Sequence, residues 1–245
     1  MIDGPSLFAR FAHPPNLLGY CGPNEAVLSQ LVSAGELAAA ELRHVAREFS
    51  GAWPYLEVIA GVWGRDPLDP SVVEAYWIGN RLLDGIDVGT WGGSVRERFR
   101  SRAGWDWPRV SEAVTAGGIP HHSFHTFCVY PWVGLLRAGV VEEALRVIDQ
   151  CRIRWGTVMG KTGDRLLVSS MPLEWDGISL SLGEERTESV LPPMTGTLAI
   201  GDLVALHWDS ACQKLTRVQL GRLRAYHDLH LAIANQGPLH RVVES

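Results

Sequence analysis

The residues best suited to chemistry gather in the segment GIPHHSFHTFCVYPW, residues 118–132. Imidazole and thiolate side chains together suit iron, zinc or nickel. On a helix, His121 and His125 share one face because they are four residues apart, and His122 points elsewhere. Cys128 follows three residues after His125. We interpret this group as a candidate metal or substrate site. The alternative is a set of packed, hydrogen-bonded histidines inside a helical domain.

A further cysteine lies in the segment HPPNLLGYCGPNE, residues 13–25. The Pro-Pro and Cys-Gly-Pro sequences favour a defined, non-helical path. Cys21 is therefore a candidate reactive thiol on an accessible loop. The alternative is a rigid structural loop around a buried cysteine.

The elements that position these side chains change in type near residue 150. Before it, segments such as AGELAAAELRHVAREF and VVEEALRVIDQ are rich in helix formers and place apolar residues at helical spacing. After it, short apolar or alternating segments between turn residues indicate strands, and a final amphipathic segment indicates a helix. We therefore expect an α+β protein with a helical domain over residues 1–150. A small OB-type β-barrel with a C-terminal helix is expected over residues 151–245.

Two helix starts show the capping-box pattern, in which a hydroxyl residue precedes Glu or Gln by three positions. Ser71 precedes Glu74 in this way, and Thr216 precedes Gln219. We expect one helix to begin at each of the two hydroxyl residues.

Cys151 and His207 occupy matching places in a longer pattern. Cys151 opens the segment CRIRWGTV, and the segment GDLVALH ends at His207 ahead of the final helix. This order resembles the nickel-iron hydrogenase maturation chaperones of the HypC/HupF type, which open with Met-Cys-Leu-Ala-Ile-Pro-Gly-x-Val and later carry Gly-Asp-x-Val-Leu-Val-His. The positions that match these two motifs are Cys151, Ile153, Gly156, Val158, Gly201, Asp202, Val204 and His207.

The resemblance implies a HypC-like β-barrel and an iron site. In that family the cysteine and histidine help to hold an iron that carries cyanide and carbonyl ligands, and the chaperone passes it from a scaffold protein to the hydrogenase large subunit. Cys151 and His207 are accordingly expected to bind this iron group, another transition metal or a partner. The chain departs from the pattern because Cys151 is internal and Trp155 replaces the family's proline. As a whole, the chain resembles an uncharacterised family known mainly from actinobacteria.

These patterns predict an accessory or chaperone protein for nickel-iron hydrogenase maturation, which binds a maturation scaffold or a large-subunit precursor. One alternative is a metal-dependent enzyme, in which the helical domain holds iron through its histidine cluster and the barrel is a docking module. Another is a structural adaptor whose cysteines are packed and inert, with Cys151 as a small buried hydrophobe that ends a helix.

Composition narrows the class of protein further. The 245 residues carry a net charge of −5, which argues against a nucleic-acid partner because such proteins usually present a basic face. No apolar segment reaches the roughly 18 residues of a membrane span, and the N-terminus lacks the features of a signal peptide. We therefore expect a cytoplasmic protein with reduced cysteines. No cysteine pair has the CxxC spacing of a structural zinc site.

Overall fold

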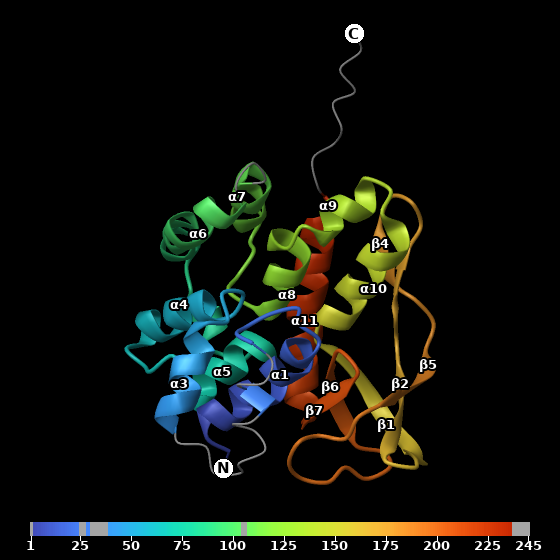
Figure 1. The fold of residues 1–245 in the computed structure, drawn as a ribbon. Coiled ribbons are helices and arrows are strands. Elements are labelled where there is room, and N and C mark those ends of the chain that lie inside the picture. Colours follow the sequence, from blue (N-terminus) through green and yellow to red (C-terminus); the bar gives the residue numbers. More distant parts are fainter. Residues whose placement is uncertain (1, 25–27, 30–38, 104–106, 237–245) are drawn as a thin grey trace.

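The computed structural model describes residues 2–24, 28–29, 39–103 and 107–236, and it is an α+β structure (Figure 1). Helices dominate the first part of the chain, and the strands follow residue 153. The helical elements of this first part are α1 (Gly4–Leu17), α3 (Ala39–Arg47), α4 (Trp53–Trp63), α5 (Pro70–Trp77), η1 (Leu83–Gly85), α6 (Val88–Ala103), α7 (Trp107–Thr115), α8 (His122–Phe124), η3 (His125–Val129), α9 (Trp132–Arg137) and α10 (Val141–Cys151).

The strands form one antiparallel sheet of five strands, in the order β5-β2-β1-β6-β7, and a separate two-stranded sheet of β3 and β4. Their bounds are β1 (Arg154–Thr162), β2 (Arg165–Ser170), β3 (Leu173–Trp175), β4 (Leu180–Leu182), β5 (Arg186–Val190), β6 (Leu203–His207) and β7 (Ser210–Lys214).

The prediction of a β-barrel is wrong, because the five-stranded sheet is not closed into a barrel in the part of the chain that the structure describes. Its outer strands approach each other at one point, where Leu191 forms an isolated parallel bridge with Ser210. One bridge does not make the continuous ladder that closure requires. The α+β class is confirmed, and the strands do begin directly after α10, as the change in periodicity predicted.

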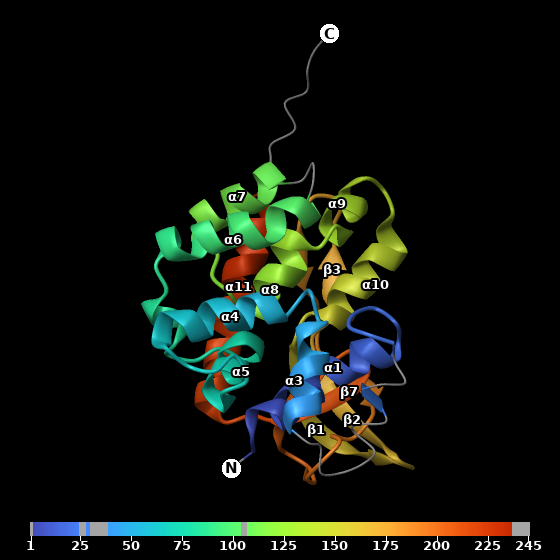
Figure 2. The same ribbon diagram turned by 60° about the vertical axis from the view of Figure 1, so that its left-hand side comes forward.

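The C-terminal helix α11 (Arg217–Asn235) joins the two parts of the chain. It runs between the N-terminal helices and α10, and it contacts α8 and η3 (Figures 1 and 2). One hydrophobic cluster accordingly unites Phe11 of α1, Trp155 of β1 and Leu223 of α11. A second, smaller cluster lies within the sheet and includes Val158, Val168 and Val204. The division into domains at residue 150 stays a prediction, and cooperative folding of a fragment that begins near Gln150 would test it.

The helix starts show how local chemistry fixed the elements. Thr216 caps α11 with both hydrogen bonds of the expected capping box. Ser71 does not cap α5: Asp69 takes that place, and its carboxylate accepts from the Ser71 backbone N–H at 2.8 Å. The reason is Pro70, whose fixed backbone suits the first helical position and places the cap at Asp69, two residues before Ser71. No helix of the described residues is long and apolar enough to cross a membrane.

Candidate metal-binding site

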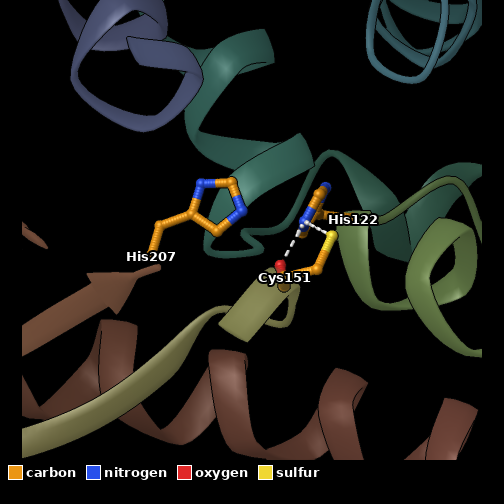
Figure 3. A group of neighbouring side chains, drawn as sticks. All are labelled: His122, Cys151 and His207. Carbon is orange, nitrogen blue, oxygen red and sulfur yellow. Dashed lines mark hydrogen bonds between the residues drawn. The ribbon is translucent and has the colours of Figure 1, made fainter. Parts of the chain in front are cut away.

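Three side chains from three elements converge where the helical part meets the sheet (Figure 3). His122 begins α8, Cys151 ends α10, and His207 ends β6. One ligand atom from each of the three lies within 4.8 Å of the other two. His122 Nε2 is 3.9 Å from Cys151 Sγ. The proximity of Cys151 and His207 that the resemblance implied is present, and His122 joins them.

The backbone around His122 explains why the sequence pattern placed it elsewhere. His121 has an extended backbone and caps α8 through its Nδ1, so the helix begins only at His122. The chain then continues as a π-helical turn from His125 to Val129. The regular α-helical spacing assumed for His121 and His125 is therefore wrong. His122 and His125 lie near each other, with ring centroids 6.4 Å apart, while His121 stacks beside His230.

His207 is oriented as a metal ligand would be. Its Nδ1 lies 2.6 Å from the Phe11 carbonyl, which can only accept, so Nδ1 carries the proton. Nε2 is left with its lone pair, buried and without a hydrogen-bond partner. The Cys151 carbonyl also faces the ring, but it does not meet hydrogen-bond geometry with Nε2. Burial holds the pKa of His207 well below its usual value, and the neighbouring His122 adds to that effect.

His122 has partners at both ring nitrogens. Nε2 lies 2.8 Å from the Cys151 carbonyl, and Nδ1 lies 3.0 Å from the Tyr76 hydroxyl. The same hydroxyl is 2.8 Å from the Gly51 carbonyl. In one tautomer, Nε2 donates to Cys151. In the other, Nδ1 donates to Tyr76, Tyr76 donates to Gly51, and Nε2 is released for a metal. Burial lowers the pKa of His122 to about 4, and the Cys151 carbonyl opposes this effect, so the ring is neutral near pH 7.

The Cys151 thiol lies at the C-terminal end of α10, which carries partial negative charge. Burial raises the pKa of this thiol to about 11, and its hydrogen bond with Thr126 opposes that effect. The Sγ–Oγ1 distance is 3.8 Å. Without a metal, Cys151 is therefore a protonated thiol, and it becomes a thiolate when a cation replaces the proton.

The three side chains line a cavity of about 40 Å³, which is room for roughly three water-sized groups. Aromatic rings form most of its wall, and His125 and Cys21 contribute polar groups. His125 Nδ1 is 3.2 Å from the Tyr55 hydroxyl. The aromatic residues of the lining are Tyr20, Phe49, Tyr76, Trp77, Tyr130 and Trp208.

Two other residues predicted for a metal site lie outside this cavity. His121 is buried against Tyr226 and His230. Cys128 is buried, and its thiol lies 3.9 Å from the His230 carbonyl. The structure therefore does not gather His121, His122, His125 and Cys128 into one site.

Cys21 lies on a short loop after α1 and lines the same cavity as Cys151. The expectation of a non-helical path is wrong for residues 14–17, because α1 continues to Leu17 through both prolines, and it is confirmed for residues 18–24. Burial raises the pKa of the Cys21 thiol, and the nearby Cys151 thiol raises it further. Without a metal, Cys21 is therefore a protonated thiol, and its role as a reactive thiol stays a prediction.

Trp208 follows His207 in the two-residue turn between β6 and β7. Its φ is 55°, and it is the one residue other than glycine among those described with a positive φ. That conformation costs an indole-bearing residue on the order of 1–2 kcal/mol. The ring is buried and packs on Tyr20, with centroids 4.1 Å apart. The turn therefore places an aromatic wall directly beside the His207 ligand.

The donor set fits a first-row transition metal. A tetrahedral zinc with bonds of about 2.3 Å to sulfur and 2.0 Å to nitrogen separates its ligand atoms by about 3.3–3.6 Å. The sulfur–nitrogen distance of 3.9 Å is close to that value. The lone pair of buried His207 Nε2 faces no donor among the described residues, and this favours a cation as its partner because buried polar atoms are normally satisfied.

The fold and this site define an α+β protein with a candidate metal-binding group of two histidines and one cysteine. The chain belongs to the family described as Family of unknown function (DUF6390), whose model matches residues 1–241. No curated protein matches the chain. No solved structure matches it either.

Proposed function

We propose that this protein is an accessory protein of nickel-iron hydrogenase maturation that holds iron at His122, Cys151 and His207. The observation that carries the proposal is the meeting of Cys151 and His207, which lie far apart in the sequence. Their two motifs resemble those of the HypC/HupF chaperones, in which the corresponding residues hold iron. In this proposal the iron, with its cyanide and carbonyl ligands, is cargo rather than a resident cofactor.

The chain's own residues supply the binding chemistry. Cys151 offers a soft thiolate, and the two neutral imidazoles complete the set. The Phe11 carbonyl orients His207, and Tyr76 orients His122, as hydrogen-bonded carbonyls and hydroxyls commonly orient metal-ligating histidines. The partner that receives or delivers the iron would be the hydrogenase large-subunit precursor or a maturation scaffold protein, and the site of action would be the cytoplasm.

The test is a Cys151→Ser variant in a strain that depends on this protein for hydrogenase activity. The substitution keeps the size of the side chain and removes the thiolate. We expect the affinity of the purified protein for iron to fall by more than about 100-fold. Capture of the precursor or scaffold should be lost, and hydrogenase activity should disappear. Cys212→Ser is the matched control, because Cys212 is a buried thiol outside the cavity. Normal hydrogenase activity in the Cys151→Ser strain would contradict the proposal.

A metal-dependent enzyme is the second candidate, and the cavity favours it. Three protein ligands with an open position are typical of catalytic metal sites. The open position adjoins a cavity that is also lined by His125 and Tyr130, whose imidazole and hydroxyl can form hydrogen bonds with a substrate. Mixing the iron-loaded protein with the hydrogenase precursor separates the two candidates. A carrier transfers its iron to the precursor, whereas an enzyme keeps it.

A further inference from the structure

Three protein ligands leave a coordination position for a tetrahedral metal, and that position adjoins the cavity. The polar groups around it are Tyr20, Cys21, Tyr76, His125 and Tyr130. A group that fills the position has to be a good ligand and available to turn toward the metal. These two conditions separate the five candidates.

The hydroxyls and the imidazole of this set are already engaged. The Tyr76 hydroxyl joins Gly51 and His122. The Tyr20 hydroxyl accepts from Arg146 at 2.7 Å, at the surface. Tyr130 donates to the Tyr20 carbonyl, and His125 bonds to Tyr55.

Cys21 differs from the chain's other cysteines. Each of the other three thiols makes a hydrogen bond. Cys151 bonds to the Thr126 hydroxyl, and Cys128 and Cys212 each bond to a backbone carbonyl. Within the residues that the structure describes, no hydrogen bond engages the Cys21 thiol. It is also the strongest ligand of the five candidates for zinc or iron once it is deprotonated.

The loop that carries Cys21 is held in place on the wall of the cavity. The buried Asn16 amide donates to the Cys21 carbonyl at 2.9 Å and to the Pro23 carbonyl at 2.8 Å. Gly22 has a φ of 85°, and a Cβ there would approach the Phe49 ring to 2.4 Å. The Asn16 hydrogen bonds hold this backbone, and Cys21 lies outside the group of ligand atoms that are within 4.8 Å of one another, so its sulfur would reach a metal by rotation of the side chain.

The loop is also joined to the turn that follows His207. The Tyr20 ring packs on Trp208, and the Arg146 guanidinium holds the Tyr20 hydroxyl. Cys21 follows Tyr20 in the chain, His207 precedes Trp208, and both line the same cavity. The strained backbone at Trp208 positions the indole ring for this contact with Tyr20.

We infer that Cys21 is the fourth protein ligand, and that it completes a site of two cysteines and two histidines for a divalent transition metal. The inference rests on the metal-binding function proposed above. On binding, the Cys21 thiol transfers its proton to solvent as the metal–sulfur bond forms, and no electrons are exchanged. A tetrahedral divalent metal then has no open position for a substrate, which disfavours the enzymatic candidate.

Cobalt(II) titration of the full chain in reducing buffer tests this inference, because each thiolate on cobalt adds a sulfur-to-metal charge-transfer absorption. We expect the wild type to show the intensity of two thiolates in a tetrahedral site. Cys21→Ser should bind with about half of that intensity and an affinity lowered by about 10–100-fold. Cys128→Ser is the control, and it should match the wild type.

X-ray absorption of the zinc-loaded wild type counts the sulfur ligands without any substitution, so the test does not depend on how a variant folds. Two sulfurs support the inference. One sulfur, with equal cobalt spectra for the wild type and Cys21→Ser, overturns the role of Cys21 and leaves the proposed function intact. A wild type without any thiolate ligand contradicts both.

Discussion

Two buried histidine clusters start from adjacent residues and differ in almost every respect. The Ser123 cluster consists of His121, Ser123 and His230. The Ser123 hydroxyl lies 2.7 Å from His121 Nδ1 and 2.6 Å from His230 Nδ1. The backbone N–H of Ile119 donates to His230 Nε2, so His230 donates to Ser123 from Nδ1, and Ser123 donates to His121.

The metal-site cluster consists of His122, Cys151 and His207. It has a thiol, a cavity beside it, and a buried imidazole nitrogen without a partner. In the Ser123 cluster, His121 Nε2 is likewise buried beside a backbone carbonyl, that of Ile78, outside strict hydrogen-bond geometry. It carries the ring proton, because Nδ1 accepts from Ser123, and none of the three residues lines this cavity. The difference teaches that burial of histidines does not identify a functional site. A functional site is identified by an imidazole lone pair that remains without a donor beside a cavity, as at His207 Nε2.

Substitution in each cluster should have opposite consequences, and this is the largest effect that we expect. His207→Ala removes a ligand, so zinc affinity should fall by more than about 100-fold, which exceeds the usual effect of losing an outer partner. Ser123→Ala leaves two histidines without their shared partner, so it should lower the free energy of unfolding by about 1–3 kcal/mol and leave zinc affinity unchanged. Competition with a chromogenic chelator and urea denaturation measure the two quantities. Loss of zinc affinity in Ser123→Ala would erase the distinction between the clusters.

Acid should weaken the metal-free protein through its neutral buried histidines. Burial lowers the pKa of His230 to about 3 and that of His227 to about 4, against about 6.5 in an unfolded chain. Between those values the unfolded chain binds more protons, so stability falls as the pH falls below about 6.5. Each histidine contributes about 1.4 kcal/mol per pH unit. Urea denaturation between pH 7 and 5 measures the slope, and His227→Gln should reduce it by about one proton. An equal slope in that variant would show that His227 is not neutral and buried in solution.

The smallest effect should come from Tyr76→Phe, which sharpens the account of how His122 is oriented. The substitution removes the hydroxyl between His122 Nδ1 and the Gly51 carbonyl. We expect zinc affinity to fall by about 10-fold, because the imidazole loses the partner that fixes its tautomer. Tyr55→Phe is the matched comparison, since Tyr55 bonds to His125 rather than to one of the three ligands. An equal loss in both variants would point to general packing rather than to His122.

The sequence predicted the α+β class and the position where strands replace helices, because periodicity and helix formers act locally. It also predicted the capping of α11, in which Thr216 and Gln219 interact with each other alone. It did not predict an open sheet. Closure depends on how the outer strands β5 and β7 approach, and those strands meet only through the bridge at Leu191. The residues of β5 and β7 show no local pattern that predicts how closely the two strands approach each other.

The site was predicted in part. Cys151 and His207 were paired through motif order, and the structure brings them together. His122 was predicted as a metal residue, but together with His121, His125 and Cys128 rather than with Cys151 and His207, because the sequence argument assumed a regular helix through His121 and His125. The cap at His121 and the π-helical turn that follows change which side chains face the cavity. Pro120 was the available signal, because a proline disfavours the α conformation at the residue before it, Ile119, and so favours a helix that begins after the proline.

The left-handed backbone at Trp208 places two incompatible demands on one position. A glycine there would relax the turn between β6 and β7 but would leave the cavity without its wall, because glycine has no ring to set against Tyr20. Retaining the indole keeps the wall and leaves the turn strained. Any attempt to engineer a more heat-resistant form of this protein by correcting unfavourable backbone conformations would choose residue 208 first. It would thereby open the pocket next to His207 while improving the hairpin that carries it.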